Sequence, residues 1–291
     1  MLSRLVSRRI RYLRYAETET SGSIESFHHY LWAYLLPALD YVLRRSPVER
    51  FATRYAIRSC GPLMDPVATV LLDHFGVKYG LTHPDHPGFD DQGAIEIQRW
   101  DGLLERPFDT ETDNPRELRK NLWPRFSAMR SRLIKAAKAS TTTAYDGKLL
   151  LIRRADEPGY YKRGGKQAAH YGAGRRALTG LEETAADLEA AGIPTEIFDC
   201  GTHGIFEQIR AFHDCCGVVA IRGAELAHLA WMRPGTQAVM VTIPHMREPL
   251  AVHRRFCAIN DVRLDVLPIL DQENAPRITA ALLLPLLKRE D

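Results

Sequence analysis

The turn Arg222–Gly223–Ala224 has the residue types and the position expected of an anion-binding site. It follows an apolar strand predicted at 218–221 and opens a helix predicted at 223–231. Backbone N–H groups at such a helix start point into the crevice of a parallel sheet, and the helix dipole favours an anion there. Phosphate is the natural guest, although many strand–turn–helix units bind no ligand.

Two charged side chains at this turn favour opposite outcomes. Glu225 lies in the first helical turn, where a carboxylate suits the dipole but competes with a phosphate for the same N–H groups. Arg222 can hold a phosphate through two parallel hydrogen bonds. The turn by itself therefore leaves open whether a phosphate binds.

A second basic segment, residues 155–178, follows a predicted strand that ends at Arg154. It is rich in glycine and tyrosine and contains Arg175 among several other cations. Loops of this length inside a compact domain are usually functional or disordered, and this one follows the ligand-binding edge of an open α/β sheet. The segment is either a solvated basic loop or an arginine clamp for a diphosphate.

From Lys148 onward, strands and helices alternate, which predicts a doubly wound parallel sheet. The predicted strands are 148–154, 194–199, 217–221, 237–243 and 263–268, and the predicted helices are 181–191, 204–213, 223–231, 248–258 and 275–288. Before Lys148 we predict helices at 24–43, 66–75 and 115–139 and strands at 51–57 and 94–100. The expected organisation is a basic arm (1–22), an N-terminal domain (23–140) and a C-terminal domain (141–291).

Composition excludes several classes of protein. A net charge of +3 with 26% charged residues is too small to imply nucleic-acid binding. Five cysteines without a CxxC pair favour a reducing compartment, hence a cytoplasmic location. The nearby residues His203, His213, Asp214 and Cys215 match no standard metal-ligand spacing, so we expect no metal site.

The first sixteen residues hold five arginines, no acid and apolar residues at near-helical spacing. They lack an apolar core long enough for a signal peptide or a membrane span. A basic amphipathic helix here could lie on an anionic membrane surface as a peripheral contact. The alternative is a helix that packs on its own domain.

Several segments, taken together, resemble glycosyltransferase family 61. The segments that carry the resemblance are Phe27 to Leu31 with Leu35 to Pro37, Leu149 to Arg154, Arg175 to Leu178, Glu207 to Ile209, Val218 to Ile221, Arg222 to Leu226, Trp231 and Pro234 to Thr236. The resemblance covers about residues 25 to 270 and is strongest from 148 onward. Three positions depart from the family pattern: Arg222 replaces a histidine, Glu225 replaces a glycine, and Thr179–Gly180 replaces an asparagine.

The resemblance implies two Rossmann-like domains facing a cleft, of the GT-B type, and an inverting glycosyltransferase that uses a UDP-sugar. The donor would be held in the C-terminal domain by Arg154, Arg175, Glu207, Arg222, Gly223, Ala224, Glu225, Pro234, Gly235 and Thr236. Here Pro234–Gly235–Thr236 would close the sugar-nucleotide pocket. Glu207 would either contribute helix-start charge or bind ribose hydroxyls.

The expected reaction needs a base for the acceptor hydroxyl and positive charge on the departing diphosphate. His29 matches the family's N-terminal histidine and is our candidate base; the alternative is a packing histidine. Because the chain has no Asp-x-Asp at a strand end, we expect arginines rather than a metal to neutralise the diphosphate, and no cofactor.

The expected partners are the nucleotide sugar and a glycan or lipid-linked acceptor. The main alternative is a non-catalytic member of the same fold that binds a glycan or a nucleotide. A dinucleotide-dependent oxidoreductase is disfavoured because no G-x-G-x-x-G follows a strand.

Overall fold

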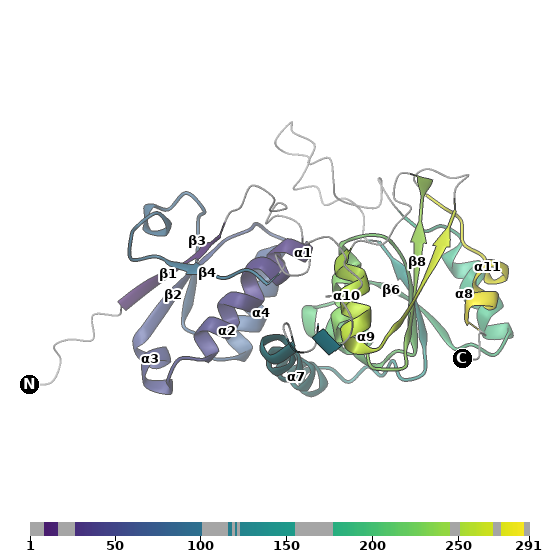
Figure 1. Cartoon of the computed structure of the whole chain (residues 1–291), viewed down its shortest axis with the longest axis horizontal. Coiled ribbons are helices and arrows are strands. Elements are labelled where there is room, and N and C mark those ends of the chain that lie inside the picture. The colour runs from purple at the N-terminus through teal and green to yellow at the C-terminus, as the bar shows by residue number, and fades with distance from the viewer. Residues whose placement is uncertain are drawn as a thin grey trace, which may run out of the picture. The chain divides into compact units, whose positions relative to one another are not determined.

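The structure, a computed structural model, describes residues 9–16, 27–100, 116–117, 120, 123–154, 177–244, 251–269 and 275–287. The chain forms two compact units, Met1–Leu104 and Glu105–Asp291 (Figure 1). Among the described residues each unit contains one sheet, and the paired strands of both sheets are parallel. The predicted class, α/β with two Rossmann-like units, is therefore confirmed.

The first unit has a four-stranded sheet in the order β3-β2-β1-β4. Its strands are β1 (Arg9–Tyr15), β2 (Thr53–Arg58), β3 (Tyr79–Thr82) and β4 (Ile95–Ile97). Its helices are α1 (Phe27–His29), the π-helix η1 (Tyr30–Leu35), α2 (Leu36–Leu43), α3 (Pro47–Ala52), α4 (Met64–His74) and the 3-10 helix η2 (Pro87–Phe89).

The basic N-terminal segment departs from the prediction, because Arg9–Tyr15 form a strand between two others rather than an amphipathic helix. Leu13 and Tyr15 are buried while the Arg14 side chain is 42% exposed, so the burial alternates with period two. Residues 1–8 of the predicted arm lie outside the described residues. The described part of the arm is thus an interior strand of the first unit.

The helical run from Phe27 to Leu43 contains three buried aromatic side chains of the first unit, those of Tyr30, Trp32 and Tyr34. Its middle turn is π-helical, and Leu36 N–H bonds to the carbonyl of Leu31, five residues back. Pro37, at the start of α2, has no N–H to donate, which suits a change of hydrogen-bond register there. The predicted helix at 24–43 is confirmed over its described residues.

The second unit has a five-stranded sheet in the order β6-β5-β7-β8-β9. Its strands are β5 (Leu149–Arg153), β6 (Thr195–Asp199), β7 (Gly217–Ile221), β8 (Gln237–Thr242) and β9 (Arg263–Pro268). Its helices are α7 (Trp123–Ser140), α8 (Leu181–Ala190), α9 (Ile205–Asp214), the 3-10 helix η4 (Ala224–Trp231), α10 (Ala251–Asn260) and α11 (Ala280–Leu287).

The predicted alternation of strands and helices after Lys148 is confirmed, with one change of helix type. The helix after β7 is a 3-10 helix instead of an α-helix. Helix α7 packs against α9 and belongs with the second unit, whereas the sequence placed it in the first domain, with the boundary after it. Its buried residue Phe126 contacts Trp231 of η4 and Phe256 of α10, so the apolar face of α7 packs on helices of the second unit.

Helices cover both faces of the second sheet (Figure 1). Alternate strand residues such as Leu149, Leu151 and Val219 form one core with side chains of α8 and α11. The opposite face buries Phe198 of β6 against Phe212 of α9, with the rings 6.4 Å apart and nearly perpendicular. Because both faces are buried, the central strands β5, β7 and β8 are mostly apolar along their length, as buried parallel strands usually are.

Candidate active site

The strand order of the second sheet identifies where a ligand would bind. The chain leaves β5 to form β6 on one side, while β7 pairs with β5 on the other side. In doubly wound sheets of this order, the connections from the two central strands diverge and leave a crevice at their carboxyl ends. Arg154 directly follows β5 and Arg222 directly follows β7, so both arginines lie at this edge.

Arg154 forms an ion pair with Glu225, and both side chains are mostly buried. The distance from Arg154 Nε to Glu225 Oε1 is 3.2 Å, and the two side chains are 8% and 17% exposed. The second carboxylate oxygen of Glu225 and the Nη1 atom of Arg154 are buried, and neither has a hydrogen-bond partner within the described part of the chain. The pair therefore joins the ends of β5 and β7 through one contact and leaves polar groups unsatisfied on both partners.

Gly223 packs directly against this ion pair. A Cβ atom added to Gly223 would lie 2.5 Å from Glu225 Oε2 and 3.3 Å from Arg154 Nη1. The backbone there is extended, with φ −168°, so any residue could adopt it and the limit on this position is space alone. The sequence predicts that the N–H groups of this turn face an anion, and the structure places the carboxylate of Glu225 against Gly223.

Arg222 is half-buried at the same edge. Burial lowers the pKa of Arg222 from its ordinary value, because the guanidinium has lost part of its hydration. Ala224 begins the 3-10 helix η4, so its N–H group belongs to the first helical turn, as the sequence predicted for the helix start.

The loop between β6 and α9 reaches the same neighbourhood. Burial and, after it, the negative charges of Glu225 and Asp199 raise the pKa of the Cys200 thiol well above its ordinary value. The carboxylate of Glu225 is thus close enough to Cys200 to affect its ionisation. Three consecutive strand ends, those of β6, β5 and β7, consequently meet around the ion pair.

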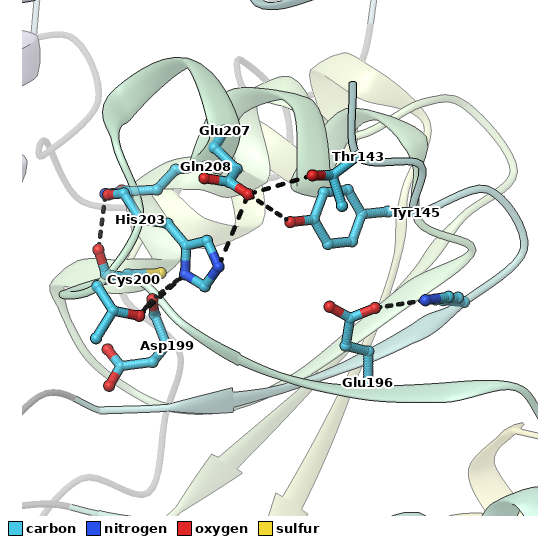
Figure 2. A network of polar contacts seen from close by, with 10 residues as sticks. Thr143, Tyr145, Glu196, Asp199, Cys200, His203, Glu207 and Gln208 are labelled. Atoms are coloured by element: carbon cyan, nitrogen blue, oxygen red, sulfur yellow. Dashed lines mark hydrogen bonds and ion pairs between the residues drawn. The ribbon is translucent and has the colours of Figure 1, made fainter. Parts of the chain in front are cut away.

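Glu207 lies in the first turn of α9, where it accepts hydrogen bonds from residues before β5 (Figure 2). Its Oε1 atom is 3.2 Å from the Tyr145 hydroxyl and 3.5 Å from the Thr143 hydroxyl. Burial and the Glu207 carboxylate raise the pKa of Tyr145, which keeps the phenol protonated as a donor. Glu207 is therefore a positioned carboxylate rather than a freely moving helix-start charge.

His203 contacts the same carboxylate from the other side (Figure 2). Its Nε2 atom is 3.8 Å from Glu207 Oε1, and its ring stacks on Phe198 at 4.3 Å. The Nδ1 atom is 2.7 Å from the carbonyl oxygen of Asp199, and because a carbonyl only accepts, Nδ1 carries the hydrogen. The roles of Tyr145, Thr143 and His203 were missed in the sequence, since their common partner appears only when α9 lies against β5 and β6.

The histidine and cysteine residues considered as metal ligands do not come together. His213 Nδ1 is 3.1 Å from the carbonyl oxygen of Trp231, and Asp214 pairs with Arg210. Among the residues that the structure describes, no three His, Cys, Asp or Glu side chains are grouped as a metal site would require.

The segment Pro234–Gly235–Thr236 lies at the opposite edge of the sheet. It precedes β8, so it is at the amino end of that strand, whereas Arg154 and Arg222 follow the carboxyl ends. The Thr236 hydroxyl donates to the Arg233 carbonyl at 2.6 Å, and Gly235 has a φ of 76°, which favours glycine. Gly235 and Thr236 line a surface hollow of ≈ 630 Å³ at this amino edge. The structure thus separates these three residues from the rest of the expected donor site.

His29, the candidate base, ends α1 in the first unit and is half-buried. Its ring is 5.3 Å from that of His28 in an edge-on arrangement. Arg175, with the rest of the basic segment 155–176, lies outside the described residues. Of the expected donor residues, the structure gathers Arg154, Arg222, Gly223, Ala224 and Glu225 at one edge, with Glu207 on the neighbouring helix start.

Comparison with known proteins agrees with the resemblance seen in the sequence. The family model described as Glycosyltransferase 61 matches residues 27–239, which is most of the chain and includes parts of both units. No curated protein matches the chain. The matched range begins at the helical run of the first unit and ends within β8, so it includes the whole carboxyl edge described above.

Proposed function

The chain belongs to glycosyltransferase family 61, and we propose that it transfers a sugar from a UDP-sugar to a glycan or lipid-linked acceptor, with inversion and without a metal ion. As a member of that family it is a transferase that uses a sugar donor. The nucleotide, the stereochemistry and the acceptor class belong to the proposal.

The observation that carries the donor site is the meeting of Arg154, Arg222 and the start of η4 at the switch point of the second sheet. Open α/β sheets bind nucleotides at this position. Arg222 and the first N–H groups of η4 supply positive charge and donors for a diphosphate. In this proposal they stabilise the negative charge that grows on UDP as the bond to the sugar breaks.

We assign Glu207 to the nucleotide side of the site. Its Oε1 atom is fixed by Tyr145 and Thr143, and its side chain remains 30% exposed. A carboxylate held in this way can accept hydrogen bonds from ribose hydroxyls without reorienting.

We assign the acceptor base to His29. A half-buried imidazole can take a proton near neutral pH, and the family match begins two residues before His29. In the proposed reaction His29 accepts the proton of the acceptor hydroxyl as its oxygen attacks the anomeric carbon. The bond between that carbon and the diphosphate oxygen breaks on the opposite face.

A second candidate function, nucleotide or glycan binding without catalysis, is favoured by one observation. Glu225 already neutralises Arg154, so one of the expected diphosphate ligands carries a counter-ion from the protein itself. If that carboxylate excludes a diphosphate, the site would hold a different ligand and transfer no sugar.

Release of free UDP separates the two functions. The full chain is incubated with UDP-GlcNAc, UDP-xylose, and GDP- and CMP-sugars, with and without EDTA, and the free nucleotide is measured. Sustained release of UDP that EDTA does not abolish supports the proposal. Binding without release supports the non-catalytic alternative, and loss of activity with EDTA contradicts metal independence.

Membrane contact is a separate expectation. No helix among the described residues is both long enough and apolar enough to cross a bilayer. Since β1 uses residues 9–15, a peripheral contact through the basic segment would depend on residues 1–8. Sedimentation with anionic vesicles, before and after deletion of those residues, tests it.

A further inference from the structure

The buried pair Arg154–Glu225 has a hydrogen-bonding demand that differs from that of a phosphate site. Glu225 Oε2 needs a donor, and Arg154 Nη1 needs an acceptor, while neither atom has a partner among the residues that the structure describes. A buried charged atom without a partner is costly, and a ligand that satisfies both atoms would remove that cost. The Arg154 side chain is 8% exposed, so solvent supplies little of what is missing.

The net charge of the pair also argues against a phosphate. The guanidinium and the carboxylate are 3.2 Å apart and cancel each other's charge. A phosphate offers only acceptors, so it would suit Arg154 but meet repulsion from Glu225. A hydroxyl donates and accepts at once, so one hydroxyl, or two neighbouring ones, can satisfy both unpaired atoms.

We propose that Arg154 and Glu225 form a subsite for hydroxyl groups of the donor, ribose or transferred sugar, while the diphosphate binds at Arg222 and the start of η4. This inference rests on the proposed function, because it takes the donor to be a nucleotide sugar. It gives Glu225, the residue that departs from the family's glycine, the role of selecting a ligand.

Two structural details support this assignment. A Cβ atom at residue 223 would lie 2.5 Å from Glu225 Oε2, so the carboxylate can occupy its position only because residue 223 is glycine. The Glu225 side chain is 17% exposed, more than that of Arg154, so the carboxylate is the part of the pair nearer to solvent. A positioned carboxylate beside an arginine discriminates strongly against ligands that lack the hydroxyl, because the buried atoms are then left unpaired.

The test combines removal of the carboxylate with removal of the hydroxyl. Wild-type protein and Glu225→Gln are titrated calorimetrically with UDP, 2′-deoxy-UDP, 3′-deoxy-UDP, UDP-GlcNAc and UDP-xylose. Glutamine keeps the shape and the acceptor for Arg154 Nε, but replaces one carboxylate oxygen by a donor. The matched control is Glu196→Gln, which removes the carboxylate of the Lys148–Glu196 pair, 2.6 Å apart, away from this edge.

If ribose is the source of the hydroxyl, the wild type binds UDP about ten- to hundredfold more tightly than a deoxy-UDP, as expected for a charged hydrogen bond. If the transferred sugar is the source of the hydroxyl, the wild type binds a UDP-sugar more tightly than UDP by the same factor. In either case Glu225→Gln loses the preference and Glu196→Gln keeps it. A preference that survives in Glu225→Gln, or tighter binding of every ligand by that variant, overturns the subsite.

Gly223→Ala provides a second variant. Its added methyl group would displace the Glu225 carboxylate, so it should lose the same preference while the melting temperature shows that the chain still folds. An unchanged preference in Gly223→Ala would contradict the geometry on which the subsite rests.

The outcomes also separate this inference from the proposed function. UDP release with no effect of Glu225→Gln keeps the transferase proposal and removes the subsite. If the wild type binds no nucleotide, titration with uridine, 2′-deoxyuridine, GlcNAc and xylose shows whether the hydroxyl subsite exists without the UDP-sugar. Binding of these that depends on Glu225 keeps the subsite without the UDP-sugar, and no binding of any of them removes both.

Discussion

The carboxyl edges of the two sheets differ in which buried polar groups are left unpaired among the described residues: the neutral Tyr30 hydroxyl in the first unit, and two charged atoms in the second. In the first unit the Tyr34 hydroxyl donates to the Leu13 carbonyl and accepts from the Arg58 N–H, each at 2.7 Å. In the second unit the pair Arg154–Glu225 makes one contact and leaves an unpaired atom on each partner. The Tyr34 hydroxyl, which uses both its donor and its acceptor, thus joins β1 to the end of β2, whereas the charged pair Arg154–Glu225 has unused atoms that a ligand can satisfy.

The two strand orders explain why each sheet has such an edge. The order β3-β2-β1-β4 places the switch point of the first sheet between β1 and β4, and the second sheet has its switch point between β5 and β7. At the first of these, Arg14 pairs with Glu96 at 2.8 Å across β1 and β4. That pair is largely exposed, so water satisfies the remaining atoms and the ion pair itself contributes little.

The largest effect is expected from Tyr34→Phe, which removes the hydroxyl that joins Leu13 of β1 to Arg58 of β2. The change leaves a buried carbonyl and a buried N–H without their partner, which should lower the free energy of unfolding by about 3 kcal/mol. Urea unfolding measures it, and Tyr12→Phe, on the half-exposed neighbouring strand position, is the control. A loss of unfolding free energy as small as that of the control would show that the Tyr34 hydroxyl does not stabilise the first unit.

A substitution in the first unit that lowers turnover alone would show that the first unit supplies the base while the second unit binds the donor. His29→Ala should lower turnover about a hundredfold by removing the base, while UDP affinity stays unchanged. Steady-state rates and calorimetry with UDP measure the two quantities. Near-normal turnover would remove His29 from the mechanism, and an equal loss of stability would instead make it a packing residue.

Acid should weaken the second unit through one buried histidine. Burial lowers the pKa of His228 to about 3, and His228 accepts a hydrogen bond from Trp231 Nε1 at 3.0 Å. Since the folded pKa lies below the unfolded value, the unfolded chain binds the proton first, and stability falls as the pH drops below about 6.5. The expected loss between pH 6.5 and 5 is about 2 kcal/mol.

Urea unfolding at the two pH values measures this loss, and hydrogen exchange of the η4 segment assigns it to the second unit. His228→Asn retains an acceptor for Trp231 and should flatten the dependence on pH. His83→Gln, at a side chain 75% exposed, should leave it unchanged. A wild type whose stability is flat between pH 6.5 and 5 would contradict the assignment.

The second unit could be predicted from its sequence much further than the first. Apolar runs such as Val218–Ile221 and Ala238–Ile243, separated by helices, predict buried parallel strands, and all five strands after Lys148 are present. In the first unit, Arg9–Tyr15 combine arginines with apolar residues in a spacing that fits both periods. Strand β3, with its four half-buried residues, has no apolar run to reveal it.

The candidate site shows the same limit. Arg154 and Arg222 were placed correctly at one edge, because both follow strands of a parallel sheet. The same rule places Pro234–Gly235–Thr236 at the opposite edge, since this segment follows a helix and precedes β8, whereas the family resemblance assigns it to the donor site. The pairing of Arg154 with Glu225 could not be predicted, because it depends on side-chain packing over Gly223.

The smallest effect is expected at Tyr145, which helps to hold the carboxylate of Glu207 in the second unit. Its hydroxyl donates to Glu207 Oε1 at 3.2 Å, while Thr143 and His203 also contact that atom. Tyr145→Phe removes one of these contacts, so the carboxylate stays in place but is less firmly oriented. Both the free energy of unfolding and the free energy of UDP binding should fall by about 1 kcal/mol or less, the usual value of one hydrogen bond.

Calorimetry with UDP and urea unfolding measure these two free energies, and Glu207→Gln, which removes the charge itself, should weaken UDP binding more. If Tyr145→Phe lowers stability while both variants bind UDP like the wild type, Glu207 only braces the start of α9, and the nucleotide contacts lie entirely at Arg154, Arg222 and η4.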